Sequence, residues 1–404
     1  EKPHGRPAKL TSIIIPCFNQ IAYTKLCLQS IEKYTTVPYE LILIDNGSTD
    51  GTQAFLEEYS RSRAGCNVIL NKRNLGFAGG NNQGITAAKG DYILLLNNDV
   101  VVTEGWLERL ITHIESDPSI GMIGPMSNSV SGPQLVKDAR YGEDLNKMQI
   151  FAEEYSRKNL GKRQDILRLV GFCLLIKKEV IDIIGGLDEN FISGNFEDDD
   201  LCLRSFVAGY RNVMAGDVFV HHYGSMTFKG NGIDYRATMQ VNRQYFADKW
   251  RGIIEVRGNI YKIKMTKEQQ LTKLIERGEE QFSQGHIESA VKIFKRVLLM
   301  DRSNFRALNN LGVIQWQIGH AVAAIETFQI ALRFNPEDSD ALANLLQAVT
   351  ETGRFDLLNL NLLNTIKQIQ PTNPDIDRLV SGHMETHGIP ENHYAVENHA
   401  ESAL

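Results

Sequence analysis

The sequence has few cysteines, no long apolar segment and no surplus of basic residues. Its five cysteines are widely spaced and form no C-x-x-C pair, which excludes a disulfide framework and a cysteine zinc site and favours a reducing compartment. No apolar run approaches the ~20 residues that span a bilayer, and the first ten residues lack the core of a signal peptide. The net charge of −6 argues against broad binding to nucleic acid or anionic membranes. We therefore expect a soluble, cytoplasmic protein.

The pattern of apolar residues predicts an α/β fold at the start of the chain. At ~150 residues per domain, 404 residues suggest two or three domains. From residue 11 to 125, short runs of Ile and Leu alternate with helical patterns, which is typical of a doubly wound, mostly parallel sheet. The expected strands are Thr11–Pro16, Tyr39–Asp45, Asn67–Leu70, Asp91–Leu96 and Ile120–Pro125, followed by Leu169–Lys177 and Asp217–His221.

Polar clusters follow three of these strands. They are Pro16–Asn19, Asp45–Ser48 and Asn97–Asp99. Because such sheets bind ligands at the carboxyl ends of their strands, these clusters are candidates for a site. Asp45 is suited to contact the ribose and base of a nucleotide. Asp99 ends the most hydrophobic strand, and a divalent cation that bridges it to a diphosphate would compensate its charge.

A glycine-rich segment, Asn74–Asn82, follows a weak strand and opens a helix. Its backbone N–H groups could face a phosphate, and a simple tight loop is the alternative. The segment matches neither G-x-G-x-x-G nor the Walker pattern. The absence of both fingerprints counts against a nicotinamide-dependent dehydrogenase and against an ATPase.

Four carboxylates stand together at Glu197–Asp200, ahead of a helical pattern. Clustered like charges raise one another's pKa, which suits a general base near neutral pH. The alternative is acid favoured by the dipole at a helix N-terminus, as Asp199 or Asp200 could be. His221 and His222 close a strand, where a histidine could ligate a metal or bind a phosphate, with a structural role as the alternative.

The motifs occur in a fixed order over residues 10–250. They are I-I-I-P-C-F-N, D-N-G-S-T-D-G, N-L-G-F-A-G-G-N-N, N-N-D, G-G-L-D-E, E-D-D-D-L-C-L-R and H-H-Y-G-S. This set resembles the family 2 glycosyltransferases, which have the GT-A fold. The resemblance implies transfer of a sugar, with inversion, from a nucleotide-diphosphate sugar to an acceptor, using Mn²⁺ or Mg²⁺. We therefore expect a hexosyl- or N-acetylhexosaminyltransferase domain over residues 1–265.

The resemblance also implies roles for single residues. Asp198 matches the base of the family's E-D pair, with Glu197 beside it. Asp99 matches the metal-binding end of the D-x-D motif, whose first aspartate is replaced here by Asn97. The metal set is Asp99 and His221, which is favoured over His222 because it is expected to end its strand. The donor-binding set is Pro16, Phe18, Asn19, Asp45, Asn74, Gly76, Asn81, Asn97 and Asn98, and the acceptor-side set is Gly171, Gly186 and Asp188.

These residues support a single displacement. Asp198 would remove a proton from an acceptor hydroxyl, thiol or amide as that group attacks the anomeric carbon, while the metal neutralises the departing diphosphate. A retaining glycoside hydrolase would need a second, opposed carboxylate. The alternatives are a catalytically weak nucleotide-sugar-binding regulator and a nicotinamide-dependent oxidoreductase, which the missing fingerprint disfavours.

From residue 267 onward the sequence shows only helical periodicity, with a repeat of 34 residues. The recurring residues are Gly285, Gly319 and Gly353, then Ala290, Ala324 and Leu358, then Phe294, Phe328 and Leu362. This pattern resembles the tetratricopeptide repeat, so we predict about three repeats over residues 266–371, with an unrelated helical bundle as the alternative. Residues 372–404 are expected to form a polar tail, in which His383 and His387 are a conceivable metal pair.

The repeats suggest a type of acceptor. Stacked helical pairs form concave grooves that bind extended peptides or helices. We therefore expect the repeats to recruit a protein or peptide acceptor in a bacterial cytoplasm. The alternatives are assembly of a polysaccharide or cell-wall glycan, and repeats that join two copies of the chain into a homo-oligomer.

Overall fold

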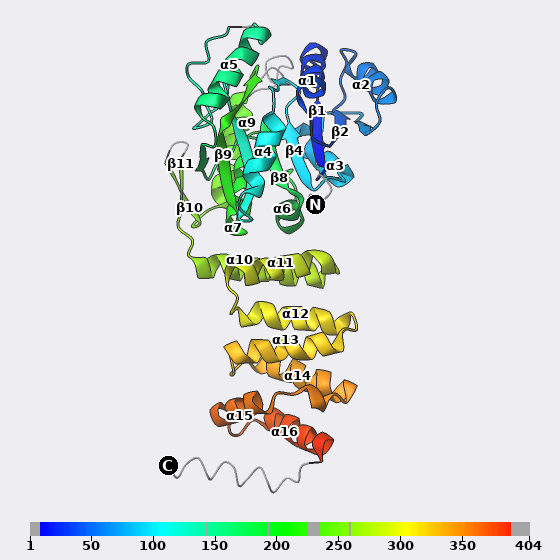
Figure 1. Cartoon of the computed structure of the whole chain (residues 1–404), viewed down its shortest axis with the longest axis vertical. Coiled ribbons are helices and arrows are strands. Elements are labelled where there is room, and N and C mark those ends of the chain that lie inside the picture. The colour runs from blue at the N-terminus through cyan, green and yellow to red at the C-terminus, as the bar shows by residue number, and fades with distance from the viewer. Residues whose placement is uncertain (1–8, 143, 193, 225–234, 258–259, 389–404) are drawn as a thin grey trace, which may run out of the picture. The chain divides into compact units, whose positions relative to one another are not determined.

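The structure is a computed structural model that describes residues 9–142, 144–192, 194–224, 235–257 and 260–388. It divides the chain into two compact units, Glu1–Thr266 and Lys267–Leu404 (Figure 1). Within the described residues, the first unit contains all the strands and the second contains only helices. This confirms the predicted fold class, an α/β unit followed by an all-α unit. Among the described helices, none is long and apolar enough to cross a membrane.

A mixed sheet forms the centre of the first unit. Its strands are β1 (Thr11–Cys17), β2 (Tyr39–Asp45), β3 (Cys66–Leu70), β4 (Tyr92–Leu96), β5 (Val100–Val101), β6 (Ile120–Ser127), β7 (Arg163–Asp165), β8 (Cys173–Lys177) and β9 (Arg211–His222). Their order is β3-β2-β1-β4-β8-β6-β9-β5, with β7 paired to β9. Strands β3, β2, β1 and β4 are parallel, whereas β8 is antiparallel to both β4 and β6. The carboxyl ends of β1, β2 and β4 therefore meet at one edge.

Helices cover both faces of this sheet. They are α1 (Ile21–Tyr34), α2 (Thr52–Arg61), α3 (Gly76–Ala87), α4 (Trp106–Glu115), α5 (Leu145–Lys158), α6 (Lys178–Ile184), α7 (Glu197–Val207) and α9 (Tyr235–Lys249), and an antiparallel pair, β10 (Ile254–Arg257) and β11 (Ile260–Ile263), follows. Ile13 and Ile15 of β1 share one core with α1, α2 and α4. Ile14 faces α3, where a Cβ on Gly84 would lie 2.3 Å from its Cγ2. The continuous isoleucine run is thus buried on both faces.

Three details of the first unit differ from the sequence prediction. Strand β9 is longer than expected, since it begins at Arg211, and the unpredicted two-residue β5 pairs antiparallel with its end. Strand β8 begins at Cys173, so residues 169–172 lie outside it. The polar and weakly patterned segment 126–167 indicates a loop region with one candidate helix; it contains that helix, α5, and also the unpredicted three-residue β7. Strands this short carry no periodic pattern, which is why the sequence did not indicate them.

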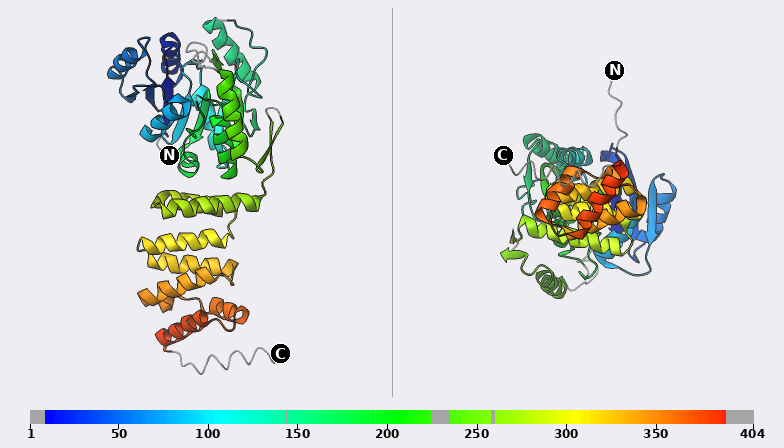
Figure 2. Two further views of the ribbon diagram at one scale, coloured as in Figure 1. Left: turned by 180° about the vertical axis from the view of Figure 1, so that it is seen from behind. Right: turned by 90° about the horizontal axis from the view of Figure 1, so that it is seen from below.

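The second unit is a succession of helical pairs (Figure 2). Its elements are α10 (Lys267–Ser283), α11 (Ile287–Met300), α12 (Phe305–Gln317), α13 (Ala321–Phe334), α14 (Ser339–Thr352), a 3₁₀ turn η1 (Phe355–Leu357), α15 (Leu360–Ile369) and α16 (Pro374–His387). A Cβ on Gly312 of α12 would lie 2.4 Å from the Phe328 ring of α13, and Gly278 stands in the same relation to Phe294. The small residue of each repeat therefore allows its two helices to pack closely.

The predicted polar tail begins later than residue 372. Helix α16 occupies much of that segment and buries Ile376 and Leu379 in the helical core. His383 is also buried, with Nδ1 at 3.0 Å from the carbonyl oxygen of Phe355. Its ring lies 4.3 Å from that of His387, but within the described residues no third His, Cys, Asp or Glu completes a metal cluster. Residues 389–404 lie outside the described residues.

Candidate active site

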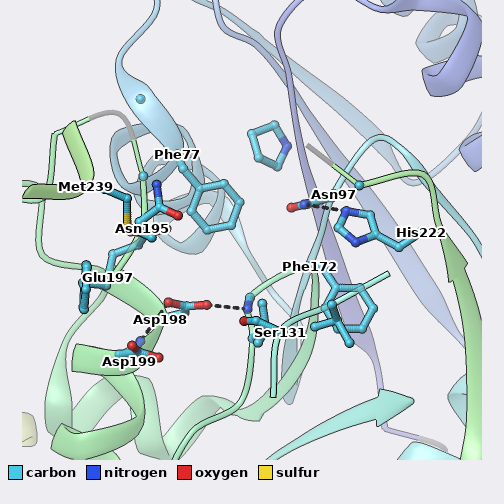
Figure 3. A pocket seen from close by; sticks show the side chains of 18 of the residues that line it. Phe77, Asn97, Ser131, Phe172, Asn195, Glu197, Asp198, Asp199, His222 and Met239 are labelled. Carbon is cyan, nitrogen blue, oxygen red and sulfur yellow. Dashed lines mark hydrogen bonds between the residues drawn. The ribbon is translucent and has the colours of Figure 1, made fainter. Parts of the chain in front are cut away.

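A cavity of about 910 Å³ lies at the carboxyl ends of β1, β2 and β4. Ten residues of the predicted site line it: Pro16, Phe18, Asn74, Gly76, Asn97, Asn98, Asp99, Gly171, Glu197 and Asp198. Figure 3 shows Glu197, Asp198 and Asp199 on one side and Asn97 and His222 on the other. The cavity therefore brings together groups that are about 100 residues apart in the sequence.

Six predicted residues do not line the cavity: Asn19, Asp45, Asn81, Gly186, Asp188 and His221. Two of them brace the loops around it. The side-chain oxygen of Asn19 accepts a hydrogen bond from the N–H of Thr49 at 2.8 Å. Oδ2 of Asp45 accepts from the N–H groups of Gly47 and Ser48, both at 3.2 Å. The other oxygen of Asp45 is buried without a partner among the described residues.

Three further residues hold helices rather than facing the cavity. Asn81 donates to the carbonyl of Phe77 within α3 at 2.9 Å. Asp188 is paired with Lys249 of α9, with Oδ2 at 2.5 Å from Nζ. A Cβ on Gly186 would lie only 2.3 Å from a side-chain oxygen on α3, so this glycine allows a close approach. Of the predicted acceptor-side set, Gly171 alone lines the cavity.

Asp99 and His222 form a buried pair on one side of the cavity. Nε2 of His222 lies 3.2 Å from Oδ1 of Asp99. Nδ1 of His222 lies 2.7 Å from the carbonyl oxygen of Ser129 and donates to it, and the Phe172 ring stacks on the imidazole at 5.1 Å. Burial lowers the pKa of His222, but the hydrogen bond and charge of Asp99 raise it overall. The imidazole is thus held on one face and at both nitrogens.

This pair suits a hard divalent cation whose coordination shell is completed by oxygen atoms of a bound ligand. Asp99 offers a carboxylate, and the bond to Ser129 leaves the Nε2 lone pair of a neutral His222 free for a metal. Among the described residues no third His, Cys, Asp or Glu joins them. The remaining coordination positions suit phosphate oxygens and water. Asn97 stands beside the pair, with Nδ2 at 3.5 Å from Nε2 of His222.

The structure places His222, rather than the predicted His221, beside Asp99 at the cavity. The Nδ1 of His221 lies 2.8 Å from the hydroxyl of Tyr141, and its ring packs against Tyr223 at 4.4 Å. Burial, with the neighbouring His222, lowers the pKa of His221 to about 4. Strand β9 ends at His222 rather than at His221, and successive side chains on a strand point to opposite faces. His222 is therefore the one that reaches the cavity.

The opposite side of the cavity carries Glu197–Asp200, here called the acid cluster, in the first turn of α7. Asp198 accepts hydrogen bonds from the N–H of Gly171 at Oδ2 and from the N–H of Asp199 at Oδ1, both at 2.9 Å. Glu197 has a buried Oε2 without a partner among the described residues. Burial and the charge of Asp198 raise the pKa of Glu197 to about 8, so Glu197 is protonated at neutral pH while Asp198 is held by N–H donors.

The other two acids of the cluster have side-chain partners. Asp199 is paired with Arg168, whose Nε lies 2.5 Å from Oδ1, and with the hydroxyl of Tyr261. Asp200 does not line the cavity. It is paired with Arg204 at 2.8 Å and with Lys249 at 2.8 Å. Asp200 therefore has the structural role that the sequence reading allowed for it.

Twenty cavity residues lie outside the predicted set of site residues. Six of them belong to motifs that the sequence indicated: Cys17, Asn46, Phe77, Asp199, His222 and Gly224. The others were not predicted from the sequence: Ser129, Val130, Ser131, Arg168, Val170, Phe172, Gly194, Asn195, Phe196, Met239, Arg243, Phe246, Ala247 and Tyr261. Many lie in loops that lack periodicity or on α9 and β11, which carry none of the motifs. Asn195 and Phe196 have φ angles of 77° and 76°. Positive φ at two consecutive non-glycine residues marks strain of the kind found at functional sites.

Two family models match separate parts of the chain. Residues 12–185 match glycosyl transferase family 2, and residues 275–339 match a tetratricopeptide repeat. The first match covers β1 to α6 and therefore the Asp99 side of the cavity except for His222. The acid cluster, α9 and β11 follow it in the chain.

Curated proteins are similar to this chain over part of their length. Glycosyltransferase AglE of Haloferax volcanii is 26% identical over 213 residues, which cover 52% of this chain and 66% of AglE. Glycosyltransferase GlyG of Streptococcus pneumoniae is 25% identical over 201 residues, covering 49% and 65%. An uncharacterized protein of Sinorhizobium fredii is 28% identical over 254 residues, covering 60% and 28%. The chain spans less than two thirds of the length of these relatives.

Solved structures are also similar to this chain. The mannosyltransferase PcManGT from Pyrobaculum calidifontis, in complex with GDP-Man and Mn²⁺, has a TM-score of 0.41 and 14% identity, over 94% of this chain and 87% of that one. A fragment of TarS from S. aureus in complex with UDP has a TM-score of 0.42 and 15% identity, over 85% and 92%. By its two family matches, this chain combines a family 2 glycosyltransferase domain with tetratricopeptide repeats.

Proposed function

We propose that this protein is an inverting glycosyltransferase that moves a sugar from a nucleotide-diphosphate sugar to an acceptor. The observation that supports this most directly is the cavity within the family 2 domain, which has Asp198 on one side and the Asp99–His222 pair on the other. A donor lying between them would have its diphosphate near Asp99 and its anomeric carbon toward Asp198. The loop after β1 and the buried Asp45 would then be near the nucleoside.

Asp198 is the proposed general base. Both of its oxygens accept backbone hydrogen bonds, which fix the carboxylate but leave further lone pairs for an acceptor. Asp198 takes the proton of the acceptor nucleophile as that atom forms a bond to the anomeric carbon. The bond from that carbon to the diphosphate oxygen breaks on the opposite face, so the configuration inverts. The neighbouring Glu197, neutral near pH 7, is placed to donate a hydrogen bond rather than to compete as a base.

Asp99 and His222 are the proposed ligands of Mn²⁺ or Mg²⁺. When bound, such a cation offsets negative charge on the leaving diphosphate. Ser129 fixes the tautomer of His222, and Phe172 fixes the plane of its ring. Asn97 in place of a second carboxylate leaves the site with less negative charge, so we expect the metal to bind together with the nucleotide rather than alone.

The repeats support a protein or peptide as the acceptor. Repeats of this type bind extended peptides or helices in their groove. The experiment is a screen of nucleotide sugars for release of the nucleoside diphosphate with and without Mn²⁺. The active, radiolabelled donor is then added to a cell extract with full-length enzyme. Label that becomes soluble on protease treatment supports a polypeptide acceptor, and label in protease-resistant glycan supports polysaccharide assembly instead.

A truncated chain tests the role of the repeats. The first unit has its own apolar core, so residues 1–266 can be prepared separately and checked by circular dichroism. We expect this truncated chain to release the nucleoside diphosphate from the donor slowly and to transfer no sugar to the polypeptide. Transfer at the full-length rate would overturn recruitment by the repeats, and sedimentation of both chains would then test whether the repeats form a homo-oligomer.

A further inference from the structure

A single loop segment, residues 168–171, holds two acids of the cluster at once. The N–H of Gly171 binds Asp198, and the side chain of Arg168 binds Asp199. Between them, the N–H of Leu169 donates to Sγ of Cys202 at 3.3 Å, one turn further along α7. The position of this segment and the position of the two carboxylates therefore depend on each other.

Arg168 is a cation that lines the cavity and is directed at the acid cluster. Its Nε lies 2.5 Å from Oδ1 of Asp199, and Nη1 donates to the hydroxyl of Ser131 at 2.9 Å. Its side chain is 20% exposed, so water screens this pair less than it screens surface pairs. Burial lowers the pKa of Arg168, but the nearby charges of Asp199 and Asp198 raise it overall. Arg168 thus interacts with both acids.

Tyr261 completes the environment of Asp199 from another element. Its hydroxyl, on β11, donates to Oδ2 of Asp199. The groups that face Asp199 are therefore Arg168 from the loop, Tyr261 from β11, and Glu197, Asp198 and the thiol of Cys202 from α7. Burial and the charge of Asp198 raise the pKa of Asp199 to about 6, against the lowering effect of Arg168.

Two adjacent buried carboxylates share a proton unless a positive charge compensates one of them. Asp200 has its own cations, Arg204 and Lys249, and does not line the cavity. Asp198 has only N–H donors as hydrogen-bond partners among the described residues. Arg168 is therefore the cation that compensates the charge of Asp199 beside Asp198.

We propose that Arg168 and Tyr261 are positioning residues for the base: by keeping Asp199 ionised and fixed, they keep Asp198 ready to take a proton from the acceptor. The role of Asp198 as the base rests on the proposed function, whereas the effect of Arg168 on the carboxylate pair does not. Arg168 lies in the family match, whereas Asp199 and Tyr261 follow it in the chain, so the assignment depends on the contact between Arg168 and Asp199.

The test compares four variants of the full-length chain. Arg168→Met removes the charge, Arg168→Lys keeps it, Tyr261→Phe removes only the hydroxyl, and Arg204→Lys is the control at an acid pair outside the cavity. The rate at which the active donor releases its nucleoside diphosphate is measured as a function of pH. For Arg168→Met we expect the acidic limb of the kcat/KM profile to move to higher pH by about 1–3 units, the usual effect of a removed opposite charge. Activity should recover at high pH.

The other variants give graded results. Arg168→Lys should keep its acidic limb near that of the wild type, Tyr261→Phe should shift it upward by less than Arg168→Met, and Arg204→Lys should leave it in place. A uniform loss of rate at every pH in Arg168→Met would show a merely structural role and would overturn the proposal.

A second readout does not need turnover. Aspartate labelled with ¹³C at the carboxyl carbon is introduced into the full chain, and Asp199→Asn and Asp198→Asn identify the signals of the pair. Arg168→Met should raise the titration midpoint of the pair by the same 1–3 units. If no donor is turned over but the midpoint shifts, the proposed function fails and the role of Arg168 holds. An unchanged midpoint overturns that role whatever the activity.

Discussion

The three aspartates of the acid cluster and the Asp99 side of the cavity differ in how fully the chain satisfies their polar groups. Asp198, Asp199 and Asp200 all accept hydrogen bonds from N–H, guanidinium, phenol or ammonium groups. Among the described residues, the carboxylate of Asp99 has one ion-pair or hydrogen-bond partner, His222. A buried carboxylate with so little compensation is costly. The base is therefore arranged by the protein, whereas the Asp99 side is left for a ligand to complete.

The largest loss of activity should follow substitution of Asp198, on the side of the cavity where the protein already satisfies the carboxylates. Asp198→Asn removes the proton acceptor, so we expect a loss of roughly 10²–10⁴-fold in kcat, the usual contribution of a positioned base. Affinity for the nucleoside diphosphate, measured by calorimetry, should stay unchanged because it depends on the other side. Asp200→Asn, two residues further along α7 and outside the cavity, should cost far less. An equal loss of rate and nucleotide affinity would instead mark Asp198 as a donor ligand.

Substitutions on the Asp99 side of the cavity should change the affinity for Mn²⁺. We expect His222→Asn to raise the Mn²⁺ concentration for half-maximal activity by at least the 10–100-fold that loss of an outer-shell partner causes. Asp99→Asn should abolish the dependence on Mn²⁺ together with most of the turnover. His221→Gln is the matched control, since it alters the neighbouring histidine and its bond to Tyr141 but should leave the Mn²⁺ dependence in place. The reverse result for the two histidines would restore His221 as the metal-side residue.

His221 and His222 show a limit of prediction from the sequence. The strand and its two final histidines were predicted, but the choice between them depends on register, and a shift of one residue exchanges the faces. The pairing of β6 with β9 is irregular between Pro125 and Met126, and β9 then continues to pair with β5. Neither feature has a local sequence signal, so only the fold could assign His222 to the cavity.

The acid cluster likewise has residues that the sequence predicted and contacts that it did not. The four acids were predicted because they are contiguous, and the isoleucine run of β1 was predicted because both faces of that strand are buried. Arg168 and Tyr261 were missed because their partner, Asp199, is 31 and 62 residues away in the sequence. A pair at such separation forms only when the loop, α7 and β11 come together. Local pattern therefore identified the acids but not the groups that control them.

The backbone contact that holds the base should produce a smaller effect. A Cβ on Gly171 would lie 3.3 Å from the Cβ of Asp198, so Gly171→Ala should displace the carboxylate by a few tenths of an ångström. Since misplacement by about 1 Å can cost about 10²-fold, we expect about a tenfold loss in kcat. KM for the donor and the Mn²⁺ dependence should not change. Val170→Ala, at the adjacent cavity residue, is the control, and an equal loss in both variants would contradict the role of this contact.

The smallest effect concerns the pH dependence of stability. Burial and Asp198 raise the pKa of Glu197 to about 8, from an ordinary value of 4.5. Between these values the folded state keeps a proton that the unfolded state has lost, so the stability from Glu197 is full below pH 4.5 and is lost as the pH rises toward 8. Glu197→Gln carries no such proton. Its melting temperature should therefore fall less between pH 5 and pH 8 than that of the wild type, by about 2–4 °C for each kcal/mol of linkage removed. Both chains should carry Trp316→Phe, so that Trp106 and Trp250 report the first unit by fluorescence. Parallel pH curves for the two chains would show that Glu197 is ionised in the folded protein, and the acid cluster would then need a further cation to compensate it.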